Sequence, residues 1–300
     1  MDGDMTIGID IGGTKIEGVL ADPTGAVHAT CRISARPGND LVVEDTVRVA
    51  RSLTGMPVPV GIGIPGQIDA EHGVVRNVVN LGITELALAD EVGARLGAPV
   101  RIENDVNAAA LGAAAVVGGE RKAGTGTVVF LNLGTGLAAG IVRDGRLDRG
   151  STGAIGEIGH VPVDPNRLPC PCGQRGCLET VACGGAVARL WPSADPAMPD
   201  ILRRAAQGDP EARRVRDMVL HAIGDALQIV AQAYDPRLIL VGGGMARTGA
   251  PLFDAIGAEM RRRAEGCPFL TTLDIPSRVR PVPDGAPIGA IGAALAAAEE

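Results

Sequence analysis

Apolar residues in this chain gather in short runs that end at glycine-rich turns, a pattern typical of buried strands in an α/β protein. Residues 5–10 form the first such run, and the turn 11–15 and a second run, 16–20, follow it. The glycines lead into a strand and not into a helix. The opening of the chain is therefore predicted to be a β-hairpin.

The same pattern returns about 125 residues later along the chain. Residues 127–132 read as a strand, Gly134-Thr135-Gly136 as a turn, and residues 138–142 as a second strand. This internal echo predicts two related α/β domains that face each other. A stretch rich in glycine and charge, residues 118–124, is expected to link them.

Further elements follow from apolar periodicity and from the turn residues that flank it. Additional strands are predicted at 58–64, 100–103 and 238–241. Helices are predicted at 44–53, 107–117, 210–234 and 287–298.

The composition limits the classes of function that remain open. Hydrophobic residues make up 46% of the 300 residues but aromatic residues only 2%, so the core must be built from Ala, Val, Leu and Ile. A net charge of −7 argues against a nucleic-acid-binding surface. Neither end of the chain reads as a secretory signal or a membrane span, and we expect a cytoplasmic protein without nucleic-acid or membrane partners.

Four potential metal ligands lie close together in the sequence: His160, Cys170, Cys172 and Cys177. Reduced core thiols or a disulfide pair would be alternative interpretations, but six cysteines in 300 residues is a low count for a disulfide scaffold. One imidazole and three thiolates suit a tetrahedral Zn²⁺. Because four protein ligands leave no open position, the predicted zinc is structural.

The same segment carries a resemblance to a known family. Glu157-Ile-Gly-His160, followed by Cys170-Pro-Cys172-Gly-Gln-Arg-Gly-Cys177-Leu-Glu179, resembles the zinc signature of the ROK family of bacterial sugar kinases and sugar-responsive repressors. The resemblance covers nearly the whole chain. It implies the two-domain fold of actin, sugar kinases and the Hsp70 ATPase, with one domain formed by residues 1–118 plus about 287–300 and the other by 119–286. It also favours a homodimer or homotetramer.

Three glycine turns are candidates for nucleotide binding, because glycine lets backbone N–H groups approach phosphate oxygens. An ordinary hairpin turn is the alternative for the first, and a plain strand-to-helix turn for the third. By resemblance they are the first phosphate motif, the second phosphate loop and the adenosine-side turn. Ala138 and Ala139 stand where the family commonly has glycine. The residues are Asp10, Gly12, Gly13, Thr14 and Lys15; Gly134, Thr135 and Gly136; and Gly242, Gly243 and Gly244.

Asn104 and Asp105 stand where a strand gives way to an Ala-rich helix. Asn and Asp are preferred helix N-caps, and one of them is expected to serve as such. A helix N-terminus also favours an ionised carboxylate. The pair resembles the catalytic Asn-Asp of the family, which makes Asp105 the predicted general base, while Glu103 is expected to be structural.

The resemblance also implies a sugar pocket. Ile83 stands where many relatives have an aromatic residue, so stacking of the sugar on a ring is not expected there. The pocket residues implied are Gly66, Asn80, Asn104, Asp105, Glu157, His160 and Glu179.

By this resemblance the residues predict a Mg·ATP-dependent hexokinase-type enzyme of carbohydrate metabolism, with glucose as the acceptor and glucose 6-phosphate as the product. N-acetylglucosamine, N-acetylmannosamine, mannose, fructose, allose or a cyclitol are alternative acceptors. A polyphosphate donor is less favoured than ATP. A sugar-sensing repressor is a remote alternative, because only nine residues precede Asp10.

Overall fold

The computed structural model describes residues 5–118 and 125–298. The chain divides into two compact units, and each is described by itself. Unit 1 contains Met1–Thr125, Gly140–Gly153 and Gly285–Glu300, and unit 2 contains Gly126–Ala139 and Ala154–Asp284. Of the expected linker, residues 119–124 lie outside the described residues.

Unit 1 is built on a five-stranded sheet with the strand order β3-β2-β1-β4-β8. The predicted hairpin is present, because β1 and β2 pair antiparallel with Asp10 opposite Glu17. β3 pairs antiparallel with β2, whereas β4 and β8 run parallel to β1. The strands are β1 (Thr6–Ile11), β2 (Lys15–Ala21), β3 (Val27–Ser34), β4 (Val60–Ile64) and β8 (Val100–Asn104).

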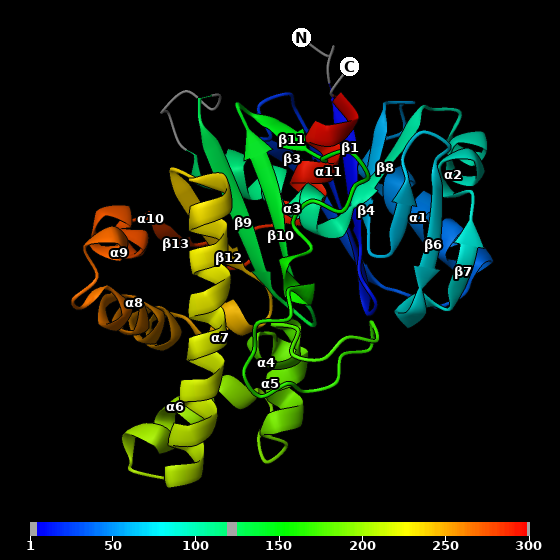
Figure 1. Cartoon of the computed structure of the whole chain (residues 1–300). Coiled ribbons are helices and arrows are strands. Elements are labelled where there is room, and N and C mark those ends of the chain that lie inside the picture. The colour runs from blue at the N-terminus through cyan, green and yellow to red at the C-terminus, as the bar shows by residue number, and fades with distance from the viewer. Residues whose placement is uncertain (1–4, 119–124, 299–300) are drawn as a thin grey trace. The chain divides into compact units, whose positions relative to one another are not determined.

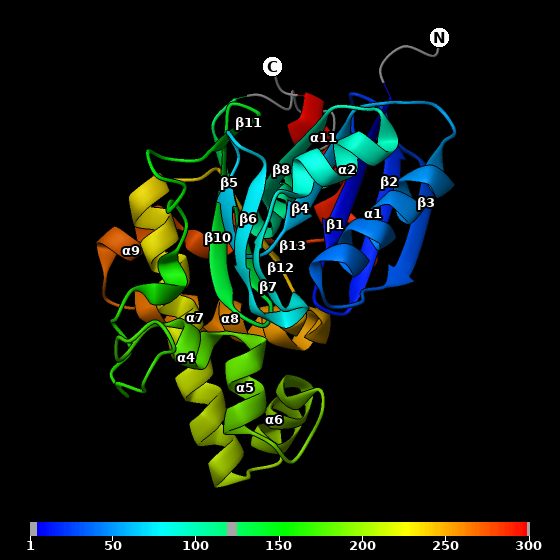
Figure 2. The same ribbon diagram turned by 90° about the vertical axis from the view of Figure 1, so that its right-hand side faces the viewer.

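Helices cover both faces of this sheet. Ile7 and Ile9 share one buried cluster with α1 (Asn39–Leu53) and α2 (Leu88–Leu96), which lie on the same face in Figure 2. The alternating positions face α11 (Ile288–Ala298) and α3 (Asp105–Val117), which pack on each other and on the sheet.

Helix α11 packs so closely on the sheet that backbone atoms of the two are in contact. A Cβ atom added to Gly8 would lie 1.9 Å from Ala290 O, and one added to Gly61 would lie 1.8 Å from Ala293 O. A Cβ on Gly292 would lie 1.7 Å from the carbonyl oxygen of Ala108 in α3. Any side chain at these positions would force the helix off the sheet, so glycine is required there.

Two residues predicted for the sugar pocket, Gly66 and Asn80, flank strands of a second, three-stranded sheet in unit 1. Its order is β5-β6-β7, with both pairings antiparallel. The strands are β5 (Gln67–Asp69), β6 (Val74–Val78) and β7 (Ile83–Leu86), and the short 3₁₀ helix η1 (Val79–Leu81) joins the last two. The sequence pattern did not predict this sheet, because its strands are short and half-exposed.

Unit 2 contains most of a sheet with the order β11-β10-β9-β12-β13. Its first two strands are antiparallel, and β9, β12 and β13 are parallel. The order and directions repeat those of β3-β2-β1-β4-β8, which confirms the predicted internal repeat. The strands are β9 (Thr127–Leu133), β10 (Leu137–Arg143), β11 (Arg146–Asp148), β12 (Leu238–Gly242) and β13 (Val279–Pro281).

The longest helix of unit 2 is α7 (Pro210–Tyr234), which begins and ends where the sequence predicts and is drawn in yellow in Figure 1. The Asp209 side chain caps it by accepting from the N–H groups of Glu211 and Ala212. The remaining helices are η2 (Ile158–His160), α4 (Glu179–Ala182), α5 (Gly184–Leu190), α6 (Ala197–Ala206), η3 (Met245–Thr248), α8 (Ala250–Ala264), α9 (Pro268–Leu273) and α10 (Ile275–Arg278).

Several predicted boundaries need correction. The helix predicted from residue 44 begins at Asn39, directly after Gly38. The strand predicted from residue 58 begins only at Val60, and Pro59 before it has no N–H to give to a sheet. The helix predicted from Asn107 begins at Asp105. Among the helices of the described residues, none is both long and apolar enough to cross a membrane.

Candidate active site

Two carboxylates lie at the carboxyl ends of β1 and β8 in unit 1, near enough for the charge of one to affect the pKa of the other. Asp10 is near the end of β1, and Asp105 directly follows β8. Burial raises the pKa of Asp10 to about 7, and the negative charge of Asp105 adds to the rise, while Lys15 opposes it. The pKa of Asp10 stays raised although Lys15 lowers it, so this lysine compensates the carboxylate only in part. This is the charge environment in which a divalent metal would be stabilised.

The first phosphate turn is closed by a hydrogen bond from Gly12 N to Lys15 O at 2.9 Å. The Lys15 ammonium lies 2.9 Å from Glu17 Oε2 on the same strand, and Arg32 of β3 also donates to Glu17. Glu17 therefore holds the phosphate-motif lysine in place. Glu17 and Arg32 are not among the site residues predicted from the sequence, although the Lys15-x-Glu17 spacing places both side chains on one face of a strand.

Asn104 is the N-cap of α3. Its side-chain oxygen accepts from Val106 N at 2.9 Å and from Asn107 N at 3.2 Å. The cap leaves Asp105 as the first residue of the helix, where the partial positive charge of the helix N-terminus favours its ionised form. Of the two expected N-cap candidates, Asn104 serves the helix and Asp105 does not.

Glu103 has the structural role that the sequence predicts. Its buried carboxylate accepts from Asn104 N at 3.0 Å and from Asn107 Nδ2 at 3.0 Å, and Arg149 Nε donates to it at 2.7 Å. These bonds fix the β8–α3 junction in addition to the helix cap. Arg149 was not selected from the sequence, because it stands 46 residues away from its partner.

Two of the residues predicted to bind sugar, Gly66 and Asn80, lie close to β6 and to the first phosphate turn, respectively. Gly66 follows β4 with a φ of 108°, and a Cβ there would lie 2.6 Å from Arg76 O, so no other residue fits without strain. Asn80 lies in η1, and a Cβ on Gly13 would lie 3.0 Å from the Asn80 Cβ atom. The first phosphate turn and Asn80 are therefore neighbours.

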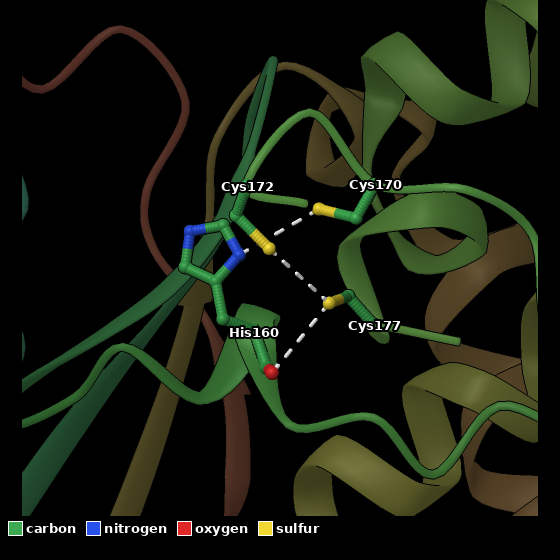
Figure 3. Close-up of side chains that lie close together, drawn as sticks. All are labelled: His160, Cys170, Cys172 and Cys177. Carbon is green, nitrogen blue, oxygen red and sulfur yellow. Dashed lines mark hydrogen bonds between the residues drawn. The ribbon is translucent and has the colours of Figure 1, made fainter. Parts of the chain in front are cut away.

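In unit 2 the four predicted metal ligands converge, as Figure 3 shows. Their ligand atoms all lie within 4.8 Å of one another; Cys172 and Cys177 Sγ are 3.7 Å apart, and Cys170 Sγ is 3.8 Å from His160 Nδ1. A tetrahedral zinc with Zn–S bonds of about 2.3 Å would place its sulfur atoms about 3.8 Å apart. A disulfide would need an S–S distance of about 2.05 Å. The cluster therefore has the spacing of a metal centre.

The environments of the three thiols differ. Hydrogen bonding from the backbone N–H of Gln174 lowers the pKa of Cys172 to about 6, whereas burial raises the pKa of Cys177 to about 12. The imidazole presents Nδ1 to the cluster, and its Nε2 lies 3.9 Å from Glu157 Oε2. His160 thus has one nitrogen for the metal and directs the other toward a carboxylate predicted to bind sugar.

The second phosphate loop contacts both Glu179 and the glycine turn 242–244 of unit 2. The N–H of Leu137 donates to Glu179 Oε2 at 3.2 Å. A Cβ on Gly243 would lie 2.6 Å from Gly134 N, so the turn after β12 lies directly against the loop. The turn after β12 leads into the 3₁₀ helix η3, and the α-helix α8 follows only after it. A cavity of about 420 Å³ borders both segments, lined among others by Thr135, Gly185 and Gly244.

We expect Asp10→Asn to stabilise the protein at alkaline pH while it abolishes activity. The raised pKa means that folding carries a penalty that is absent below about pH 4, grows between pH 4 and 7, and is complete above about pH 7. A shift of about three units corresponds to about 4 kcal/mol at most. Chemical unfolding without Mg²⁺ should show a gain that is roughly 2–3 kcal/mol larger at pH 8 than at pH 5. No gain at pH 8 would mean that a cation or hydrogen bond already compensates Asp10.

Comparison with known proteins decides the family. Residues 6–300 match the model of the ROK family. The chain belongs to the ROK family. Its α/β architecture is the actin-like ATPase fold of the ROK sugar kinases, as the resemblance implies.

Three relatives illustrate the range of the family. Glucokinase of Thermotoga maritima is 35% identical, covering 82% of this chain and 84% of the relative. N-acetyl-D-glucosamine kinase of Erwinia tasmaniensis is 32% identical, covering 84% and 88%. The structure of a Streptomyces griseus ROK glucokinase in complex with glucose and AMPPNP is 31% identical, covers 97% of this chain and 98% of that one, and superimposes with a TM-score of 0.75.

Proposed function

We propose that this ROK protein is an ATP-dependent sugar kinase that phosphorylates the 6-hydroxyl of a hexose, with glucose as the acceptor. The observation that carries the proposal is the acidic pair of unit 1, Asp105 at the N-terminus of α3 and Asp10 beside the first phosphate turn. Similarity to glucokinases, one of them solved with glucose and an ATP analogue, supports the same reaction.

Asp105 is the general base of the proposed reaction. Its carboxylate takes the proton of the sugar 6-hydroxyl, the oxygen attacks the γ-phosphorus, and the bond from that phosphorus to the β-phosphate oxygen of ADP breaks. Lys15 and the backbone N–H groups of the glycine turns stabilise the negative charge that spreads over the transferring group. Mg²⁺ with ATP would supply further charge neutralisation, and Asp10 is the residue that would hold it.

The acceptor would be recognised by amide and carboxylate side chains, which suit a polyol because each carboxylate can accept one or two hydroxyl donors. The side-chain oxygen of Asn104 already accepts a hydrogen bond in the helix cap. Its amide N–H groups are therefore the part suited to donate to a sugar oxygen. The residues proposed to take part are those that the resemblance implies: Gly66, Asn80, Asn104, Asp105, Glu157, His160 and Glu179.

The metal cluster is proposed to hold one structural Zn²⁺. Three thiols and one imidazole are its preferred ligands, and the sulfur and nitrogen spacing fits the edges of a tetrahedron. When bound, the ion would fix the fold of a segment that is otherwise poor in regular structure. It would also fix His160 and Glu179, which flank or belong to the metal-binding stretch.

The test is an ADP-release assay with Mg·ATP against glucose, mannose, fructose, N-acetylglucosamine and N-acetylmannosamine. We expect turnover with glucose at the highest kcat/KM. A higher kcat/KM for an N-acetylated sugar would keep the kinase and overturn the acceptor. Folded, zinc-loaded protein without turnover on any of the five would overturn the hexose kinase, and allose, a cyclitol and polyphosphate would then be assayed.

A further inference from the structure

Helices α4 and α5 of unit 2 hold the second phosphate loop from one side. The N–H of Gly184 donates to Gly134 O at 2.7 Å. The buried thiol of Cys183 lies 2.9 Å from Thr135 O, to which it donates, and it is also within reach of Glu179 O at 3.1 Å. Two successive carbonyl groups of the loop are thus bound to the start of α5.

These bonds determine where the loop directs its donors. The peptide bonds Gly134–Thr135 and Thr135–Gly136 are trans, and in a trans peptide the C=O and N–H groups point in opposite directions. With both carbonyls held by α5, the N–H groups of Thr135 and Gly136 point to the opposite side of the loop. Two aligned N–H groups are an arrangement that favours an anion such as a phosphate.

Glycines at both contact surfaces show how close the packing is. A Cβ on Gly185 would lie 2.6 Å from Thr135 O, and a Cβ on Gly136 would lie 2.7 Å from Glu179 Oε2. Leu137 N, the next donor of the loop, is bound by that same carboxylate. Neither segment can shift without moving the other.

The metal cluster is joined to helix α4. Cys177 stands two residues before α4, and its carbonyl oxygen accepts from Thr180 Oγ1 at 2.7 Å and from Thr180 N at 2.9 Å. The path from the metal ligands to the phosphate loop is therefore Cys177, one helical turn, and Cys183.

We propose that Cys183 is a positioning residue for the nucleotide: through α4 and α5 it makes the direction of the phosphate-loop N–H groups depend on the metal cluster. The proposal rests on the proposed ATP-dependent function. It assigns to the cluster an influence on the phosphoryl donor, in addition to its influence on the acceptor.

The test measures binding of the ATP analogue AMPPNP with Mg²⁺ by calorimetry, without sugar, and KM for ATP and glucose separately. Cys183→Ala should weaken AMPPNP binding and raise the ATP KM by about 2- to 10-fold, as expected for one lost hydrogen bond. Cys183→Ser keeps a donor and should restore most of this loss. Cys267→Ala, which removes a half-buried thiol outside the cluster, is the matched control and should change neither.

A second variant keeps the proposal testable if Cys183→Ala fails to fold. Gly185→Ala places a methyl group against Thr135 O and should also raise the ATP KM more than the glucose KM. Metal removal should weaken AMPPNP binding in the wild type and should add little in Cys183→Ala, because both act through one path.

Three outcomes are distinguishable. Wild-type protein that binds no AMPPNP would overturn the proposed ATP-dependent function. Normal AMPPNP binding in both Cys183→Ala and Gly185→Ala would overturn the positioning role alone. Equal changes in the ATP and glucose KM values, with a lowered melting temperature, would also overturn it, because they would show general destabilisation.

Discussion

Asp105→Asn is expected to lower kcat by about 10²- to 10⁴-fold while glucose still binds. The amide cannot accept the hydroxyl proton, but it keeps the size of the carboxylate and its position at the first residue of α3. The Asn104 cap and the Glu103 network remain, so the β8–α3 junction should stay folded. Single-turnover kinetics and glucose calorimetry together separate the chemical step from binding.

Asp90→Asn provides the matched control for this variant. Asp90 is an exposed acid in the first turn of α2, so the same change of charge occurs at a helix N-terminus away from the acidic pair. Its kcat should equal that of the wild type. If Asp105→Asn retained more than about a tenth of wild-type turnover, another group would be the base, since a positioned base typically contributes at least 10²-fold.

Loss of the metal is expected to have the largest effect on stability. Structural zinc contributes about 10–16 kcal/mol in small zinc-binding peptides, and unit 2 has a larger core that should retain part of its fold. Elemental analysis should find one zinc per chain. Cys172→Ser should lower the melting temperature and weaken glucose binding together, because His160 and Glu179 depend on the same segment.

Cys267→Ser is the control for this prediction, since that thiol lies in unit 2 outside the cluster. Its melting temperature and zinc content should match the wild type. A Cys172→Ser variant with an unchanged melting curve would show that the thiols are only packed together. Folded and active protein without zinc would exclude a structural metal.

Local chemistry explains why much of the fold could be predicted. The strands β1, β9 and β12 are short runs rich in apolar residues, and each ends at a glycine turn. Helix α7 carries Pro210 at its first turn with Asp209 as its cap. Such elements are specified by residues next to each other in the chain. The topological repeat followed from the same runs, because both hairpins contain a Gly-Thr turn between two of them.

Contacts between distant residues could not be predicted in this way. The bond from Arg149 to Glu103 and the contact of Cys183 with Thr135 each join residues more than 40 positions apart. Cys183 is buried, and nothing in the neighbouring sequence shows that its thiol donates to a carbonyl group of the phosphate loop. The prediction that Asn104 or Asp105 caps α3 left the choice open, and backbone geometry decides it.

The glycine contacts of α11 have a consequence for the order in which the protein can be made. One face of the first sheet of unit 1 stays uncovered until α11 has been synthesised, and α11 begins only at Ile288, whereas β1 ends at Ile11. Until then the apolar face formed by Val19 and Ala21 has no cover from α11. The strands β1 and β2 are thus made long before the helix that completes their packing, and until then their apolar face is exposed to aggregation.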